Sequence, residues 1–347
     1  MLNRLGGLTG CTLLSILLLQ SLPAAAEEVV NIYSYRQPDL IAPLTEAFSE
    51  KTGIRTRIVF ADKGLEERIR AEGVNSPADV ILTSDVSRLA AAAELGVTQS
   101  VANDAISTNI PGQFRDPAGH WVGITTRSRV VYAARDRVAQ DTITYEELAD
   151  PKWRGRICTR SGQHVYSIGL IASMIAHHGP DGAEKWLEGV KNNLARKPAG
   201  NDRAQVKSVF AGECDIALGN TYYMALMLTN RKETEQKDWA NSVKVLFPNG
   251  DGRGSHVNIS GMAMAAHAPN RANAAKLMAF LASEEAQRIY ASANHEYPVK
   301  PGVPVSDMVK SFGTLNADRL PISEIAGHRR QASELVEKVG FDDGPSS

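Results

Sequence analysis

Apolar and polar positions near the start of the chain switch between the period of a strand and the period of a helix. Residues 29–35 form an apolar run, and residues 54–60 alternate apolar with polar side chains, as half-buried strands do. Between them, an apolar stripe at helical spacing begins behind Pro38 and stops at Gly53. The elements predicted here are strand 29–35, a helix after Pro38 with the stripe Leu40, Leu44, Ala47 and Phe48, strand 54–60, helix 65–72, strand 80–82 and a helix between Asp85 and Gly96.

This alternation of strands and helices is interrupted by a long β-prone stretch, after which it resumes. The later elements expected are the β-prone stretch 120–133, strand 156–159, helices 168–177 and 183–191, strand 214–218, a second β-prone stretch 256–264, and helices 272–282 and 283–294. Alternating strands and helices favour a mostly parallel sheet with helices on both faces. The pattern therefore predicts an α/β protein of two lobes joined by two long crossing strands.

The two crossings suggest where the chain passes from one lobe to the other. We expect an amino-terminal lobe of residues 27–126 and 253–303, and a carboxyl-terminal lobe of residues 127–252 and 304–347. Ligands of open α/β sheets bind beyond the carboxyl ends of the strands, so two facing lobes place one site in the cleft between them.

Residues 1–26 have the organisation of an export signal. Asn3-Arg4 precedes the apolar stretch 8–22, and Ala24-Ala25-Ala26 forms a small-residue cleavage pattern. The stretch is interrupted by polar residues and is short for a membrane span of about 20 apolar residues, which disfavours a retained anchor. The segment ending at Cys11 resembles a lipoprotein box, but the apolar run continues past it. Cleavage after Ala26 leaves enough chain for two domains of roughly 150 residues.

Charge and cysteine content restrict the partners and the compartment. The formal net charge is −1 and no basic tract occurs, which argues against a nucleic-acid partner. No later segment reaches the length of a membrane span, so a soluble mature chain is expected. Cys158 and Cys214 remain after processing, and an oxidising compartment would permit a disulfide between them. Two buried free thiols are the alternative.

Motifs of common enzymes are missing from the sequence. It has no Walker A loop, no His-Glu-x-x-His and no Gly-x-Ser-x-Gly elbow. An exported hydrolase using Asp79 or Asp85 with His164 is the remaining enzymatic alternative, although the spacing of these residues matches no known triad. We therefore expect a binding protein.

Adjacent tyrosines follow a predicted strand at Tyr222 and Tyr223. The strand turns at Gly219-Asn220, and Thr221 can cap a following helix. Two neighbouring hydroxyls can converge at such a turn, and the positive end of a helix favours a phenolate. Phenolates are hard oxygen donors of the kind that a trivalent cation selects, and such a cation can displace the phenolic proton. Plain packing of the two rings is the alternative.

Several stretches along the chain together resemble one family. They are Asn31-Ile-Tyr-Ser-Tyr-Arg-Gln37, Asn75-Ser-Pro-Ala-Asp-Val80, Asp150-Pro-Lys-Trp-Arg-Gly-Arg156, Gly212-Glu-Cys-Asp-Ile216, Asn220-Thr-Tyr-Tyr223 and Asn294-His-Glu-Tyr-Pro-Val299. From Val29 to the final helix the chain resembles the periplasmic ferric-ion-binding proteins of ABC iron importers. The resemblance implies a two-lobe periplasmic-binding-protein fold of type II and a monomer that delivers iron to an inner-membrane permease driven by an ATPase.

The resemblance also implies the ligands of the metal. It makes Tyr222 and Tyr223 ligands of Fe(3+), and the segment 160–166 offers Tyr166 as a third, with His164 as the alternative. Some members carry a histidine after the first strand, where this sequence has Gln37-Pro38, so an amino-terminal protein ligand is in doubt. Tyr35, or less plausibly Tyr33, is the candidate for an extra ligand on that side.

Charge counting suggests what completes the site. Three phenolates cancel the charge of Fe(3+), and a carbonate dianion would leave the cluster negative, so cationic support is needed. The planar fork of arginine suits such an anion. The resemblance assigns Arg36, Gln37 and Arg127 to anion binding, with carbonate as the hypothesis and phosphate or citrate as alternatives. The rival function is a binding protein of the same fold for an oxyanion, a phosphonate, thiamine or a polyamine.

Overall fold

Strands and helices alternate at the start of the chain. The structure is a computed structural model that describes Met1 and residues 28–345. The predicted export signal lies almost entirely outside the described residues. The first elements are β1 (Val29–Ser34), α1 (Pro38–Thr52), β2 (Arg55–Phe60), α2 (Leu65–Glu72), β3 (Val80–Thr83) and α3 (Val86–Glu94). Strand β1 pairs in parallel with both β2 and β3, as the alternating pattern predicts.

Helix α1 illustrates how the local sequence sets an element. Pro38 occupies its first turn, where the missing N–H costs nothing, and Gly53 ends it in the left-handed conformation at φ 74°. The buried face contains Ile41, Leu44 and Phe48, whereas the predicted stripe members Leu40 and Ala47 are only half-buried. The helix is therefore rotated slightly from the expected orientation, because Ile41 takes the core position.

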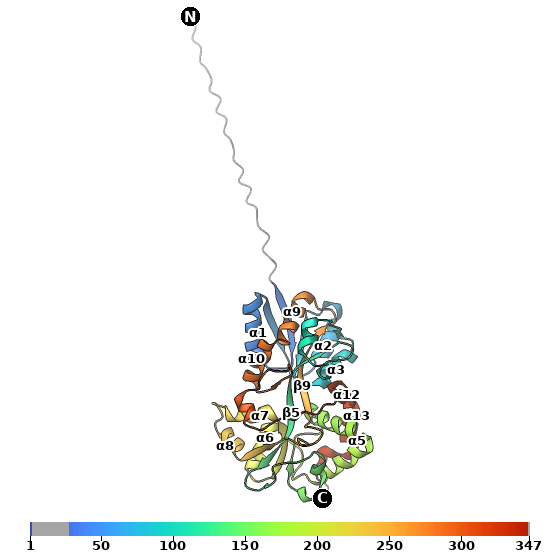
Figure 1. The fold of residues 1–347 in the computed structure, drawn as a ribbon. Helices are drawn as coiled ribbons and strands as arrows, with labels where there is room; N and C mark the ends of the chain where they lie inside the picture. The colour runs from blue at the N-terminus through green and yellow to red at the C-terminus, as the bar shows by residue number, and fades with distance from the viewer. Residues whose placement is uncertain (2–27, 346–347) are drawn as a thin grey trace.

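Two long strands run through the middle of the molecule and connect its two halves, β5 (Val122–Ala134) and β9 (Val257–Ala265) (Figure 1). They pair with each other antiparallel, from Val122 opposite Met262 to Ser128 opposite Val257. Strand β9 continues the first sheet by pairing with β3, and the second half of β5 pairs with β7 (Ile216–Asn220) and β8 (Val243–Leu246). The predicted crossing strands thus connect the two parts of the sheet, whose strand order is β2-β1-β3-β9-β5-β7-β6, with β6 at Ile157–Cys158.

The sheet is mixed, which refines the predicted parallel arrangement. The parallel pairs are those of β1 with β2 and β3, and of β6 (Ile157–Cys158) with β7. Each pair that includes β5 or β9 is antiparallel, because these strands pass between the two halves in opposite directions. The α/β class is confirmed.

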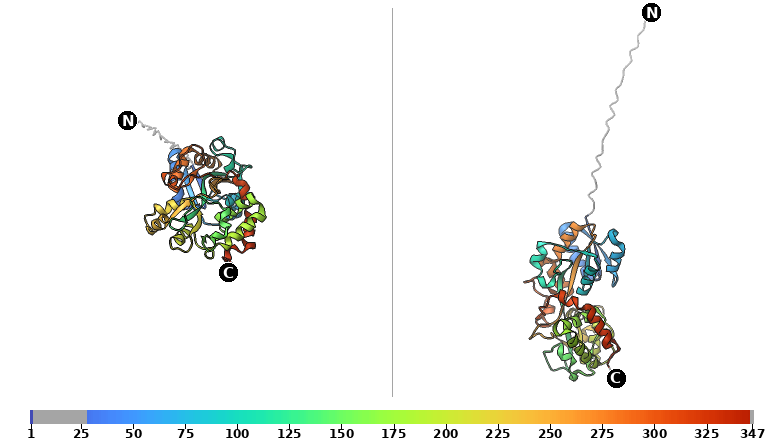
Figure 2. Two further views of the ribbon diagram at one scale, coloured as in Figure 1. Left: turned by 60° about the horizontal axis from the view of Figure 1, so that its bottom comes forward. Right: turned by 90° about the vertical axis from the view of Figure 1, so that its right-hand side faces the viewer.

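The remaining helices lie around this curled sheet, some packed against its strands and others against neighbouring helices (Figure 2). They are α4 (Asp104–Asn109), α5 (Val165–Asn192), α6 (Asp202–Phe210), α7 (Thr221–Leu228), α8 (Glu235–Asn241), α9 (Arg271–Leu281), α10 (Glu284–Asn294), α11 (Asp307–Lys310), α12 (Ile322–Gly327) and α13 (Arg329–Val339), and the short strands are β4 (Thr98–Gln99) and β10 (Tyr297–Pro298). The two helices predicted over 168–191 are one element with a kink, because Gly179 has φ 69° ahead of Pro180.

Two hydrophobic clusters make up the described core. One lies where α1, α9 and α10 cover β1 and β3, around Leu44, Phe48 and Leu277. The other extends from α2 and α3 through β5 to α5 and α13. Helix α12 packs against both α3 and α5. The exact division into two lobes stays a prediction. In the described part of the chain, no helix combines the length and apolar character needed to cross a membrane.

Candidate metal centre

Three of the predicted tyrosine ligands lie together at the starts of α5 and α7. The hydroxyl oxygens of Tyr166 and Tyr222 are 3.2 Å apart. The rings of Tyr222 and Tyr223 stack with their centroids 4.2 Å apart and their planes inclined by 31°. The side chains come from residues 56 positions apart in the sequence, so the fold creates a cluster of phenols that no local motif contains.

The adjacent tyrosines occupy the first turn of α7 because β7 ends at Asn220. The carbonyl of Asn220 accepts a hydrogen bond of 2.6 Å from the hydroxyl of Tyr132, which fixes the end of the strand. This close approach requires glycine at position 219, since a Cβ there would lie 2.1 Å from the Tyr132 ring. The turn predicted at Gly219-Asn220 is therefore held by the side chain of a crossing strand.

Tyr166 is positioned by the cap of α5. His164 is the N-cap residue, and its Nδ1 accepts the backbone N–H of Tyr166 at 3.2 Å. The two rings meet edge to face, with centroids 4.6 Å apart. Burial, followed by the charge of Arg160, lowers the pKa of His164 to about 3, so the imidazole is neutral. The structure thus gives the alternative ligand His164 a capping role beside the tyrosine cluster.

The surroundings keep Tyr222 and Tyr223 protonated when no cation is present. Burial raises the pKa of Tyr222 well above its ordinary value, and the neighbouring Tyr166 and Tyr223 raise it further. Burial and Tyr166 likewise raise the pKa of Tyr223 to about 12. Arg127 acts in the opposite direction on the pKa of Tyr222. A cation bound by these oxygens must therefore displace protons, which a trivalent ion does far more readily than a monovalent one.

Arg127 is a buried cation beside these phenols. Its side chain is 1% exposed, and its guanidinium carbon lies 5.4 Å from the centroid of the Tyr166 ring. It forms a long salt bridge with Asp85, with Nη2 3.8 Å from Oδ2. None of its three guanidinium nitrogens has a hydrogen-bond partner within residues 28–345. The hydrogen-bonding capacity of this planar fork is therefore unused within the described residues.

Arg36, the second predicted anion residue, has different surroundings. It forms a buried salt bridge with Glu296, and its Nη2 donates to Ser260 Oγ at 2.7 Å. Glu296 is fully buried, and Arg36 helps to hold the pKa of this carboxyl below its usual range against the opposing effect of burial. The positive charge of Arg36 is therefore largely balanced by Glu296 inside the fold.

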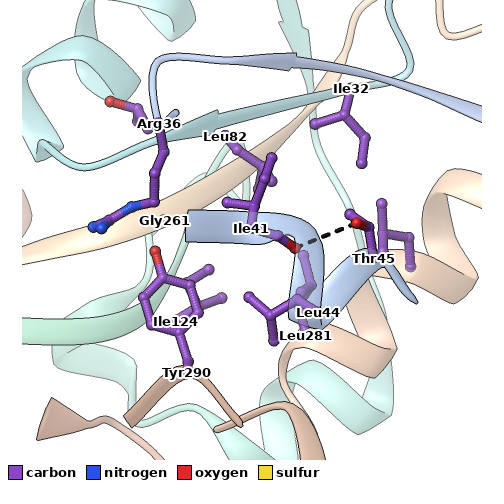
Figure 3. A pocket seen from close by; sticks show the side chains of 12 residues that line it. Ile32, Arg36, Ile41, Leu44, Thr45, Leu82, Ile124, Gly261, Leu281 and Tyr290 are labelled. Atoms are coloured by element: carbon purple, nitrogen blue, oxygen red, sulfur yellow. Dashed lines mark hydrogen bonds between the residues drawn. The ribbon is translucent and has the colours of Figure 1, made fainter. Parts of the chain in front are cut away.

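A mostly apolar pocket adjoins Arg36 on the side of α1 and α10 (Figure 3). Ile41 and Leu44 line it, and the ring of Tyr290 stands near the Arg36 side chain, 5.3 Å from its guanidinium carbon. None of the three clustered tyrosines lines this pocket. It is a cavity of the hydrophobic core and offers a cation no set of oxygen ligands.

The other candidates from the amino-terminal side, Tyr35, Tyr33 and Gln37, make no contact with the tyrosine cluster among the interactions of the described residues. The hydroxyl of Tyr35 accepts the backbone N–H of Leu65 at 2.8 Å, and the Arg88 guanidinium covers its ring at 3.9 Å. The Tyr33 hydroxyl donates to Glu72 at 3.0 Å. Gln37 is exposed at the start of α1 and makes no side-chain cap bond. The structure does not join these residues to the tyrosine cluster.

Sequence reasoning missed a group of charged residues behind the tyrosines. Asp202 is fully buried and accepts hydrogen bonds from Arg129 at 2.7 Å and from Arg160 at 3.0 Å. The Arg160 guanidinium lies 5.2 Å from the Tyr166 ring centroid, and that of Arg203 lies 5.2 Å from the ring of Tyr223. The only local signal was an Asn201-Asp202 helix start, which says nothing about long-range partners.

The disulfide partners and the hydrolase candidates also have defined places. Cys158 and Cys214 form a disulfide between β6 and the residues just before β7, which begins two residues later than the predicted strand. Asp79 accepts hydrogen bonds from Asn31 and Asn270, and Asp85 caps α3. Within residues 28–345, neither carboxylate is hydrogen-bonded to His164, and no group of three or more His, Cys, Asp or Glu side chains is placed to hold a metal.

Comparisons with known proteins agree on one kind of relative. Residues 75–314 match the family described as bacterial extracellular solute-binding protein. The chain is 41% identical to iron uptake protein A1 of Synechocystis sp. over 91% of its length and 88% of that protein.

Solved structures point the same way. The fold matches the Bordetella ferric binding protein with a TM-score of 0.85 and 49% identity, covering 91% of this chain and 100% of that one. It matches the Trichodesmium protein IdiA (FutA), solved in complex with iron and citrate, with a TM-score of 0.87 and 41% identity, covering 90% and 99%.

Proposed function

The chain belongs to the bacterial extracellular solute-binding protein family, and from that premise we propose that it is a periplasmic protein that binds ferric iron for an ABC importer. The iron is held by the phenolates of Tyr166, Tyr222 and Tyr223 together with a small anion. The observation that carries the proposal is the 3.2 Å contact between the hydroxyls of Tyr166 and Tyr222, with Tyr223 stacked beside them.

The chemistry of this cluster suits a hard trivalent cation. Three phenols provide oxygen donors only, which is the ligand type that hard cations select. Tyr222 and Tyr223 lie in the first turn of α7, and the positive end of the helix dipole there favours their ionised form when the metal arrives. Binding then exchanges phenolic protons for iron.

Arg127 is the residue that we assign to the anion. Three phenolates neutralise the ion, so an added carbonate would make the cluster negative, and the buried guanidinium with unpaired nitrogens balances that charge. Arg36 supports the same region more weakly, since Glu296 and Ser260 hold it. Citrate would satisfy the same electrostatic requirement.

The transport cycle that we propose has three steps. Ferric iron binds the tyrosines, the two halves joined by β5 and β9 close around it, and the closed protein delivers it to an inner-membrane permease driven by an ATPase. No covalent bond of the cargo is made or broken. Family membership and the iron-binding relatives support the first and last steps, and the two strands that cross between the halves are where we expect the hinge for the second.

A visible absorption titration tests the proposal. Iron-stripped protein is titrated with ferric citrate, with and without bicarbonate, beside a Tyr222→Phe/Tyr223→Phe variant. We expect a phenolate-to-iron band that saturates at one equivalent in the wild type and is lost in the variant. The matched control is Tyr33→Phe/Tyr35→Phe, which removes two phenols that are bonded elsewhere and should keep the band. A wild-type protein without the band would refute the tyrosinate site.

A further inference from the structure

We propose that Asp202 is the positioning residue that holds the two ligand-bearing segments, 160–166 and 220–223, in one arrangement, an inference that rests on the iron site proposed above. Asp202 lies in the first turn of α6 and is completely buried. It belongs to neither segment, yet both of its carboxylate oxygens are used to join them.

The first connection fixes the turn that carries the adjacent tyrosines. Oδ2 of Asp202 accepts the backbone N–H of Asn220 at 2.9 Å, at the residue where β7 ends and α7 begins. This N–H belongs to the last residue before the helix, so the bond sets the direction in which the first turn of α7 leaves the sheet. Together with the Tyr132 hydroxyl on the Asn220 carbonyl, it restrains both sides of this residue.

The second connection reaches Tyr166 through an arginine. Oδ1 of Asp202 accepts from Arg160 Nη1 at 3.0 Å, and the Arg160 guanidinium lies 5.2 Å from the centroid of the Tyr166 ring. The side chain of Arg160 is 12% exposed, so the carboxylate determines where this planar cation rests. A guanidinium held over a ring restricts the ring's position as well as contributing a cation–π attraction.

The third connection ties the same carboxylate to the crossing strand β5. Arg129 Nη1 donates to Oδ2 at 2.7 Å, and Arg129 is opposite Asn220 in the β5–β7 register, two residues after Arg127. One carboxylate therefore links the Tyr222–Tyr223 turn, the Tyr166 segment and the strand that carries the anion residue.

The charge of Asp202 makes the positioning role testable. If the residue acted only through its charge, Asp202→Asn would leave iron affinity unchanged or raise it, because three phenolic protons exchange for one trivalent ion without changing the net charge of the site, and Asp202 repels an added anion. If it acts by positioning, the same substitution weakens binding, because an amide cannot accept from two arginines and a backbone N–H without turning a donor toward one of them.

The experiment compares Asp202→Asn with Asp215→Asn by ferric-iron competition against EDTA. Asp215 is also a carboxylate between two arginines, accepting from Arg137 at 2.7 Å and from Arg156 at 2.5 Å, but it contacts no tyrosine of the cluster. We expect Asp202→Asn to lower the iron affinity by about 10- to 100-fold, the usual effect of removing a group that orients metal ligands, and to shift the phenolate band. Asp215→Asn should leave both unchanged.

Two further measurements test the positioning role even if Asp202→Asn does not fold. Arg160→Gln removes only the connection to Tyr166 at a partly exposed site, and we expect a smaller loss of affinity in a folded protein. A crystal structure of iron-free Asp202→Asn, or of Arg160→Gln should the first not fold, should show the contact between Tyr166 and Tyr222 lengthened from 3.2 Å.

The outcomes separate this proposal from the function on which it rests. An unchanged contact, or an unchanged or higher affinity in Asp202→Asn, would overturn the positioning role. A wild-type protein that shows no tyrosinate band would refute the iron site, while the iron-free structures would still decide whether Asp202 holds the two segments.

Discussion

Tyr222 and Tyr223 have the same side chains as Tyr33 and Tyr35, but the two pairs have opposite surroundings. The hydroxyl of Tyr222 meets another phenol at 3.2 Å, whereas those of Tyr33 and Tyr35 are bonded to Glu72 and to the backbone of Leu65. The first pair follows the end of a strand and begins a helix, while Tyr33 lies inside β1 and Tyr35 directly after it.

This difference indicates which tyrosine hydroxyls a metal could use without breaking a hydrogen bond of the fold. If a hydroxyl that is hydrogen-bonded within the fold binds a cation instead, its former partner is left without a hydrogen bond. This costs about 1–3 kcal/mol when the partner is buried. Phenols whose neighbours are other phenols lose little when a cation replaces their protons. Tyrosine pairs are therefore distinguished by what their oxygens already bind.

The pH dependence of iron binding should give the largest effect. The pKa of Tyr222 is raised above its ordinary value and that of Tyr223 to about 12, so both are protonated between pH 5 and 8, and we expect both to lose protons when iron binds. Apparent affinity should fall as the pH falls, by about tenfold per pH unit for each proton released. Chelator competition across this range measures the slope.

A matched set of variants sharpens this measurement. Tyr166→Phe should reduce the slope by about one proton, and Tyr33→Phe/Tyr35→Phe should leave it unchanged. A slope that stayed the same in Tyr166→Phe would show that this phenol gives up no proton to the metal.

Substitution of Arg127 should weaken iron binding, whereas substitution of Arg36 should lower the stability of the fold. Arg127→Gln removes a fork with no hydrogen-bond partner, so we expect the bicarbonate dependence to disappear and iron affinity to fall by about 10- to 100-fold. Arg36→Gln instead leaves the fully buried Glu296 unpaired, and the free energy of unfolding should fall by about 3–5 kcal/mol.

Urea unfolding and iron competition, measured on both variants, provide the check. Equal losses of stability in the two variants, or an intact bicarbonate dependence in Arg127→Gln, would contradict the different roles given to these arginines.

Tyr35→Phe should have the smallest effect on iron. The substitution removes the acceptor of the Leu65 N–H at the start of α2, so we expect a loss of about 1 kcal/mol in unfolding free energy and an unchanged phenolate band. A weakened or shifted band would place Tyr35 among the ligands and end the contrast between the two pairs.

The sequence predicted most of the elements because their patterns are local. The alternation of strands and helices, the crossing strands and the tyrosines at the start of α7 all follow from residues close together in the chain. The crossing strands also explain why the sheet is mixed, which a count of strands and helices could not reveal.

The contacts that could not be predicted from the sequence join residues far apart in the chain. Arg36 and Glu296 are separated by 260 positions, and nothing in either neighbourhood signals the other. Asp202 lies 42 positions from Arg160 and 73 from Arg129, so its use as a shared acceptor depends on how α6 packs beside β7. The hydrogen-bond partner of the Tyr35 hydroxyl could not be predicted for the same reason, since it is an N–H in the next helix.

The disulfide between Cys158 and Cys214 brings the two tyrosine-bearing segments together before any metal binds. It joins positions 56 residues apart, each a few residues before a segment that carries proposed iron ligands. Closing such a loop removes conformational freedom from the unfolded chain. The entropy of bringing these two segments together is therefore largely lost when the thiols oxidise, before any metal is present, and iron arrives at segments that are already side by side.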